Sequence, residues 1–189
     1  MICNNRELFL SSLKSTNRPG IEKVLTKLEI IGFFEAPASR KDHLAYLGGL
    51  LQHSLNVYNV SMVLYNQLKA LKPDLKIQEE SIIITSLLHD VCKGNRYTMA
   101  DNGTYVKNYN FPVGHGEKSV ILLLKWGLKL TEEEMLAIRW HMGGWHVPNN
   151  EEQQTDYVKA IDSYPLVSLL HAADTLASKV LEIEFKTDV

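Results

Sequence analysis

The chain has 189 residues, of which 45% are hydrophobic and 22% are charged, as expected for a soluble globular protein of one domain. The net charge is −2 and the pI is about 6.4, so no overall basic field attracts nucleic acid, although a few local cations could bind a small nucleotide. The sequence shows no signal-peptide layout and no apolar stretch long enough to cross a bilayer. Together with only two, widely separated cysteines, Cys3 and Cys92, this predicts a cytoplasmic protein without membrane association.

Helical periodicity dominates the first half of the chain. It predicts helices over residues 7–13, 21–34, 47–71 and 79–91. Residues 17–20 read Asn-Arg-Pro-Gly and separate the first two helices, and the long third helix ends near Pro73.

The second half begins with an irregular segment, residues 93–114, in which the alternation of residues 104–107 predicts at most one small β-hairpin. Helices are then predicted over residues 117–128, 131–141 and 165–181. Thr131 and Glu134 have the spacing of a capping box, whereas the polar residues 151–156 are predicted to form a loop. The predicted fold class is therefore all-α.

His89-Asp90 is the most informative pair, because it directly follows an apolar run over residues 82–88. Burying an imidazole and a carboxylate unpaired costs several kcal/mol, so both need partners or a metal ion. Adjacent side chains diverge by about 100° on an ideal helix, so both reach one cation only if the helix ends at this point. Lys93 follows one turn after Asp90 on the same face.

Further candidate ligands lie on separate segments, and each alone also has an ordinary structural explanation. His53 could be a hydrogen-bonded core histidine, and His115, in a glycine-flanked turn, could cap a helix or face an anion. His141 could be a surface histidine stabilised by the helix dipole. Asp174 lies among apolar residues and needs a cation, a donor or solvent, and His171, one turn away, could brace it.

The joint pattern favours a metal site over other chemistry. The sequence has no His-Glu-x-x-His motif of zinc proteases, and no serine or cysteine triad is supported. Histidine and carboxylate ligands without a thiolate suit Mn, Fe, Ni, Co, Zn or Mg, and do not choose among them.

The order His53, His89-Asp90, Asp174 resembles the H…HD…D signature of the HD superfamily of metal-dependent phosphohydrolases. His115 and His141 resemble the additional ligands of the branch that binds two metals. Residues 48–53 (Gly-Gly-Leu-Leu-Gln-His), Leu87-Leu88-His89-Asp90 and Gly114-His115 are especially similar to the HD domain of bacterial OB-fold 3′-to-5′ exoribonucleases. The resemblance covers about residues 48–180. It implies an HD-type helical bundle and a single domain over residues 1–189, with a helical extension over 1–40 and a metal-binding core over 41–182.

The resemblance also implies an activity, namely cleavage of a phosphoester bond of a nucleotide or short oligonucleotide by a metal-activated hydroxide. The implied centre holds two divalent ions, one bound by His53, His89, Asp90 and Asp174, and the other by Asp90, His115 and His141. Asp90 and Lys93 are the implied catalytic residues, and Lys93 is a phosphate contact or leaving-group acid. Lys118 and Arg139 are further candidates for substrate contacts.

The sequence departs from the family pattern at Cys92, where a glycine usually precedes the lysine; the cysteine narrows the site or only fills space. No OB-fold segment precedes the domain and no Gly-Tyr-Pro motif follows, so neither processive RNA binding nor cyclic-di-GMP hydrolysis is expected. The aromatic residues of the irregular segment form either a lid that stacks on a base or ordinary loop packing: Tyr97, Tyr105, Tyr109 and Phe111.

Two other functions stay open. In a mononuclear 5′-nucleotidase or dNTP hydrolase, His115 and His141 would contact substrate instead of a second ion. In a catalytically silent regulatory module, the same residues would bind a metal or nucleotide without turnover. Homodimer formation is a further expectation, and the sequence does not define the substrate.

Overall fold

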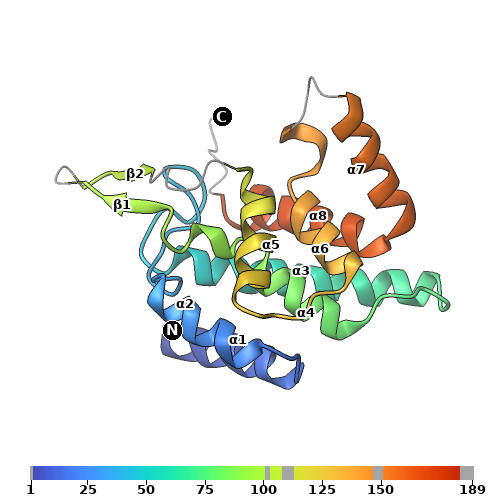
Figure 1. Ribbon diagram of the computed structural model, residues 1–189, viewed down its shortest axis with the longest axis horizontal. Helices are drawn as coiled ribbons and strands as arrows, with labels where there is room; N and C mark the ends of the chain where they lie inside the picture. Colours follow the sequence, from blue (N-terminus) through green and yellow to red (C-terminus); the bar gives the residue numbers. More distant parts are fainter. Residues whose placement is uncertain (1, 101–102, 108–112, 147–150, 184–189) are drawn as a thin grey trace, which may run out of the picture.

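The computed structural model describes residues 2–100, 103–107, 113–146 and 151–183. Within these ranges the protein is helical apart from one two-stranded hairpin, which confirms the all-α prediction (Figure 1). The α-helices are α1 (Ile2–Ser15), α2 (Ile21–Ile30), α3 (Gly49–Leu71), α4 (Glu79–Leu88), α5 (His115–Lys125), α6 (Glu132–Trp140), α7 (Glu151–Ser163) and α8 (Pro165–Leu176). The strands are β1 (Tyr97–Met99) and β2 (Tyr105–Lys107). Short helical turns are η1 (Val91–Lys93), η2 (Gly143–His146) and η3 (Ala177–Leu181).

Helix α3 is central to this arrangement. It packs against α4 and α8 and also contacts α1 and η3. Helix α6 packs against both α5 and α8, while α1 and α2 lie together on one side of the bundle and α7 lies on the opposite side (Figure 1). The ends of α4 and α6, the start of α5 and the interior faces of α3 and α8 are therefore brought towards one another.

Two clusters of buried apolar side chains form the core. The first packs α1 and α2 against α3 and α4 and includes Phe9, Leu28, Phe33, Leu50 and Leu87. The second joins α3, α4, α6 and α8 and includes Val57, Ile82, Trp140, Leu166 and Leu170. Each fully buried side chain of this kind contributes about 1.5–3 kcal/mol to stability. Helix α3 passes from the first cluster to the second between Leu55 and Val57, close to His53.

The helix bounds differ from the sequence predictions in several places. Helix α1 is longer than residues 7–13, and α2 ends at Ile30 instead of residue 34, because Gly32 takes a φ of 69° within a series of turns. The predicted loop at residues 151–156 is wrong, since these residues begin α7. Most of α7 faces solvent, so its polar sequence reflects a solvated helix.

The predicted hairpin and capping box are both confirmed. Strands β1 and β2 pair antiparallel with Thr98 opposite Val106. At the start of α6, the Thr131 hydroxyl accepts from the Glu134 N–H, and the Glu134 carboxylate accepts from the Thr131 N–H. No helix in the described part of the chain is long and apolar enough to cross a membrane.

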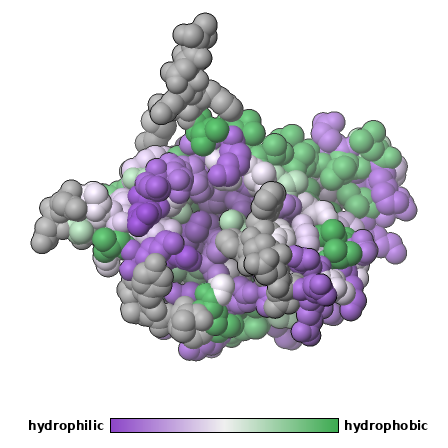
Figure 2. Space-filling model, turned by 90° about the horizontal axis from the view of Figure 1, so that it is seen from above, coloured by the Kyte–Doolittle hydropathy of each residue, from purple (hydrophilic) through white to green (hydrophobic). Residues whose placement is uncertain are grey.

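Some apolar side chains remain on the surface. Figure 2 shows hydrophobic residues gathered towards the end of the molecule where α3 ends. There, Val63, Leu68 and Leu71 are 61%, 44% and 84% exposed. Homodimer formation remains a prediction.

Candidate metal centre

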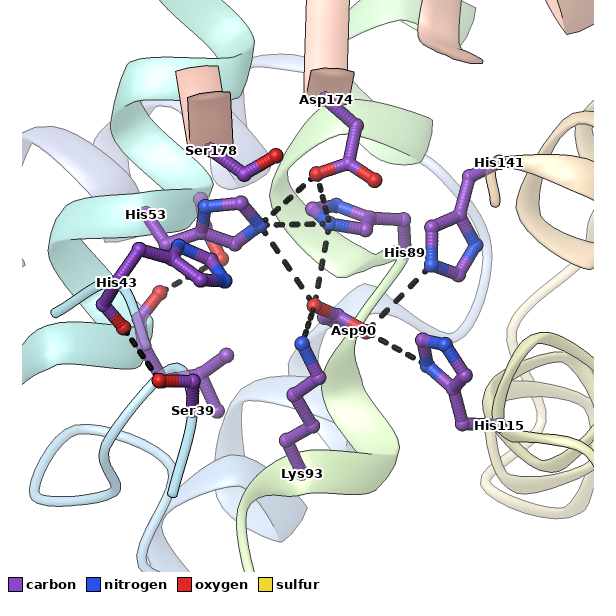
Figure 3. Close-up of polar contacts among 12 residues, drawn as sticks. Ser39, His43, His53, His89, Asp90, Lys93, His115, His141, Asp174 and Ser178 are labelled. Atoms are coloured by element: carbon purple, nitrogen blue, oxygen red, sulfur yellow. Dashed lines mark hydrogen bonds and ion pairs between the residues drawn. The ribbon is translucent and has the colours of Figure 1, made fainter. Parts of the chain in front are cut away.

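The six predicted ligands converge on one buried centre (Figure 3). They come from five helices or helix ends, and they are His53 on α3, His89 and Asp90 at the end of α4, His115 at the start of α5, His141 at the end of α6 and Asp174 on α8. The side chains of His53, His89, Asp90 and His141 are at most 2% exposed. Residues far apart in sequence thus place six ligand groups within one small volume.

The end of α4 explains how two adjacent residues reach the same centre. His89 keeps helical dihedral angles and its N–H bonds to the Thr85 carbonyl at 2.9 Å, whereas Asp90 leaves the helix with φ −106° and ψ 18°. The chain then enters η1, where the Lys93 N–H bonds to the Asp90 carbonyl. As the sequence required, the helix ends at the site, so the two side chains no longer diverge.

One group of ligand atoms surrounds Oδ2 of Asp90. The His53 Nε2 atom lies 3.3 Å from His89 Nε2 and 3.2 Å from Asp174 Oδ1. Asp90 Oδ2 lies 3.4 Å from His89 Nε2 and 3.6 Å from His53 Nε2. His53, His89 and Asp174 therefore form one group that could hold a cation, and Asp90 Oδ2 borders this group.

The other oxygen of Asp90 faces a second group. Its Oδ1 atom lies 3.0 Å from His115 Nδ1 and 3.6 Å from His141 Nε2 (Figure 3). The two oxygens of one carboxylate thus point to two different sets of histidines.

Hydrogen bonds on the far side of the rings determine which nitrogen faces the centre. The Nδ1 atoms of His89 and His141 lie 2.9 and 2.7 Å from the backbone carbonyls of Ser86 and Ile138. A carbonyl can only accept, so each Nδ1 must carry the proton, and in the neutral ring Nε2 keeps the lone pair that a metal requires. Both rings are therefore prepared as ligands.

Two observations show that this donor set fits a divalent cation. His141 Nε2 is buried and has no hydrogen-bond partner among the described residues. Burial, together with the charges of His115 and His89, lowers the pKa of His141 to about 3, so this ring is neutral at pH 7. A buried lone pair aimed at a carboxylate is costly unless a cation lies between them.

Two of the candidate ligands, His53 and His115, have raised pKa values. Burial alone would lower the pKa of His53, but its hydrogen bonds and charge interactions with Asp174 and Glu182 outweigh that effect and raise the pKa to about 9. At His115, burial is similarly outweighed by hydrogen bonds with Asp90 and Cys92, and the pKa rises to about 9. Divalent ions compete with protons for such nitrogens, so metal binding here would release protons.

Of the predicted substrate contacts, Lys93 lies at the centre and Arg139 lies beside it. Lys93 Nζ lies 2.6 Å from Asp90 Oδ2. Arg139 pairs with Glu117 at 2.9 Å and stacks over Trp140, and it borders a pocket of about 280 Å³ that His115 also lines. Lys118 lies in the first turn of α5, and its contact with substrate stays a prediction.

Sequence reasoning missed two residues beside the centre. Glu182 contacts Nδ1 of His53, and His43 contacts Glu182. Glu182 lies between the apolar residues Leu181 and Ile183, which is a weaker form of the signal that Asp174 gave.

His171 does not brace Asp174 as predicted. Its Nδ1 lies 2.7 Å from the backbone carbonyl of His141, so it holds the end of α6 instead. This contact depends on the packing of α6 against α8, which no local sequence pattern indicates.

Two further predictions concern Cys92 and the aromatic lid. Cys92 is fully buried, and its sulfur belongs to a group with ligand atoms of Asp90 and His115. Tyr97 and Tyr105 lie on the hairpin, whereas Tyr109 and Phe111 lie outside the described residues, so the lid stays a prediction.

Comparison with protein families identifies the fold. The family model described as HD domain matches residues 50–178, most of the chain and nearly the segment over which the resemblance was seen. The chain belongs to the HD domain family. This confirms the predicted HD superfamily membership.

A curated relative matches almost the whole length of this chain. It is the dihydroneopterin 2′,3′-cyclic phosphate phosphodiesterase of Methanocaldococcus jannaschii, 27% identical over 175 residues, which cover 93% of this chain and 62% of the relative. The chain thus spans under two thirds of the relative's length. No solved structure gives a significant match.

Proposed function

We propose that this HD domain protein is a metal-dependent phosphohydrolase that cleaves a phosphodiester bond at a two-metal centre. The observation that carries the proposal is Asp90, whose two oxygens face separate sets of histidines. One ion would be held by His53, His89, Asp90 Oδ2 and Asp174, and the other by Asp90 Oδ1, His115 and His141. When bound, two such ions polarise the phosphate and lower the pKa of water.

Lys93 has the position required of a catalytic cation. Burial alone would lower the pKa of Lys93, but the charge of Asp90 and the hydrogen bond to it outweigh burial and raise the pKa, so the ammonium persists at neutral pH. Its side chain is still 12% exposed, so it can meet substrate at the edge of the centre. From there Lys93 would contact a phosphate oxygen and donate a proton to the leaving oxygen.

The substrate class is proposed from the curated relative and from the pocket beside His115. The relative's name specifies a cyclic phosphodiester on a heterocyclic compound. The pocket offers the polar side chains of Glu117, Arg139 and Gln153 next to a candidate ligand, and its volume of about 280 Å³ is close to the lower limit for small-molecule sites. We therefore propose a nucleotide or nucleotide-like phosphodiester, with a 2′,3′-cyclic phosphate as the first compound to assay.

Metal content per chain, measured by mass spectrometry, tests the centre. Wild type, Asp90→Ala and Asp90→Asn would be purified without chelators or a histidine tag, with Asp162→Ala on the exposed face of α7 as the matched control. We expect about two ions per chain in wild type and control and a marked loss in both Asp90 variants. Hydrolysis of 2′,3′-cyclic nucleotides and bis(p-nitrophenyl) phosphate would follow the metal content.

Other outcomes would favour the other functions. One ion per chain with phosphomonoesterase activity would support a mononuclear nucleotidase. Two ions without hydrolysis of any phosphoester would support a silent binding module. No ion after aerobic and anaerobic loading would overturn the phosphohydrolase proposal.

A further inference from the structure

Glu182 is a buried carboxylate outside the six-ligand group, and its contacts point towards that group. Its side chain is only 1% exposed. His53 Nδ1 lies 3.0 Å from both of its oxygens, Asn56 Nδ2 donates to Oε1 at 2.9 Å, and His43 Nδ1 contacts Oε2. A carboxylate this deeply buried needs such partners, and two of the three are imidazoles.

Three separate segments form this contact. His53 and Asn56 lie on α3, His43 lies in the loop before α3, and Glu182 directly follows the π-helical turn η3. The Glu182 N–H bonds to the Ala177 carbonyl at 3.1 Å, a bond that closes this wider turn. The loop is fixed as well, because the Ser39 hydroxyl donates to the His43 carbonyl at 2.7 Å (Figure 3).

The hydrogen-bond partner of Nδ1 distinguishes His53 from the other two histidines whose Nε2 faces the centre. His89 and His141 each direct Nδ1 to the carbonyl three residues earlier in their own helix. In α3 the equivalent carbonyl, that of Leu50, accepts from the Ser54 hydroxyl instead. His53 therefore has a carboxylate as its partner, and a carboxylate both fixes the ring tautomer and increases the basicity of the opposite nitrogen.

We propose that Glu182 is a positioning residue for the metal centre. It keeps the proton of His53 on Nδ1, directs the His53 Nε2 atom towards the first ion and thereby sets the affinity for that ion. His43 and Asn56 hold Glu182 in place. The inference rests on the proposed function, because it assigns His53 as a ligand. Both Glu182 and His43 lie outside the family match over residues 50–178, so the segments that flank the match supply the carboxylate and its second imidazole partner.

A double-mutant cycle tests this role through metal binding alone. Wild type, Glu182→Ala, Glu182→Gln, His53→Asn and the double variant His53→Asn/Glu182→Ala would be freed of metal and titrated with Co²⁺, followed by visible absorption. Glu182→Gln keeps the size and one acceptor, so it separates charge from packing. Glu29→Gln is the matched control, since Glu29 is exposed and pairs with Arg6 far from the centre.

We expect Glu182→Ala to weaken Co²⁺ binding about 10- to 100-fold and Glu182→Gln to weaken it less. In the His53→Asn background, removal of Glu182 should change the affinity by no more than about twofold, because Glu182 acts through His53. Ring ¹⁵N spectra of the zinc-loaded protein should show the His53 proton on Nδ1 in wild type and control. Circular dichroism of the metal-free proteins verifies that each variant is folded.

Equal Co²⁺ affinity in wild type and folded Glu182→Ala would overturn the role of Glu182 and leave the proposed function standing. The same conclusion follows if the losses from His53→Asn and Glu182→Ala simply add, since Glu182 then acts elsewhere. Failure of wild type to bind Co²⁺ would instead overturn the proposed metal centre itself.

Discussion

Two groups of charges among the described residues differ in how completely they are paired. Around Arg18, between α1 and α2, each guanidinium nitrogen donates: Nε to Glu80, Nη1 to Glu134 and the Lys129 carbonyl, and Nη2 to Glu134. Glu134, which is fully buried, also accepts from the Ser81 hydroxyl. This Arg18 cluster thereby joins the loop after α1 to α4 and α6.

The metal centre shows the opposite arrangement. Two Nε2 atoms face each other at 3.3 Å, and the Nε2 of His141 has no hydrogen-bond partner among the described residues. A fully paired polar network makes a fold rigid and specific, whereas convergent groups of the same kind are stable together only with a shared proton or cation. Completeness of pairing, more than burial or charge, therefore distinguishes the Arg18 cluster from the candidate metal centre.

Each cluster contains one long cation, and the largest expected effect comes from removing the one at the metal centre. We expect Lys93→Met to lower kcat for phosphodiester hydrolysis about 10²- to 10⁴-fold, because a proton donor and phosphate contact is lost. Metal per chain should stay at the wild-type value, since no ligand is removed. Lys125→Met, at the exposed end of α5, is the control. Normal kcat in a fully loaded Lys93→Met would show that Lys93 is structural, like Arg18.

Next in size is the loss of the structural carboxylate. Glu134→Ala leaves Glu80 as the carboxylate partner of Arg18 and also removes the acceptor for Ser81 and the capping box, so it should lower the free energy of unfolding by about 2–4 kcal/mol, measured by urea denaturation. Glu134→Gln should cost less, and Glu132→Ala, exposed at the start of α6, less than about 1 kcal/mol. Metal per folded chain should not change in any of the three. Loss of metal without loss of stability would reverse the roles assigned to the two clusters.

Chelation should destabilise the protein only where the metal centre is intact. At an ion concentration of 10 times Kd, each bound ion contributes about 1.4 kcal/mol to stability, so two ions together contribute about 2.8 kcal/mol. We expect wild type to lose roughly this total when a chelator is added, measured by urea denaturation at fixed protein concentration. Asp90→Ala should show no such loss. An equal effect of chelator on wild type and Asp90→Ala would mean that the ion binds somewhere else.

The smallest stability effect is expected at His141. In the metal-free protein, His141→Leu loses the Nδ1 bond to the Ile138 carbonyl but also removes a buried nitrogen without a partner. These changes oppose each other, so unfolding should shift by less than about 1 kcal/mol while metal content falls from two ions to one. A loss of several kcal/mol without metal would show that His141 is fully paired after all.

The sequence predicted the local features well. The capping box at Thr131 and the hairpin near Val106 depend on neighbouring residues, and both are present. Helix α7 was missed because most of its surface faces solvent, so its polar residues resemble those of a loop. Its existence depends on packing against α8, which no local pattern records.

The sequence predicted which residues form the candidate site but not which of them contact one another. Most of the six ligand groups stood out because a polar residue interrupts or ends an apolar segment, and burial makes such residues need a partner. His115 stood out instead through its glycine-flanked turn. Glu182 gave a weaker form of the first signal and lies beyond the pattern that linked the others. His171 was given the wrong partner because Asp174 is its neighbour on the helix, whereas the carbonyl of His141 is its neighbour in space.

The sequence by itself therefore determined the helices with a buried apolar face, the family and most of the side chains that must be satisfied inside the protein, because periodicity, capping and the cost of burying charge act over a few residues. Only the tertiary structure decided which of those side chains meet. The break after His89 divides the oxygens of Asp90 between two groups, and η3 brings Glu182 to His53. Those contacts depend on distances of a few ångströms between segments separated by up to 129 positions, and such distances are set by packing.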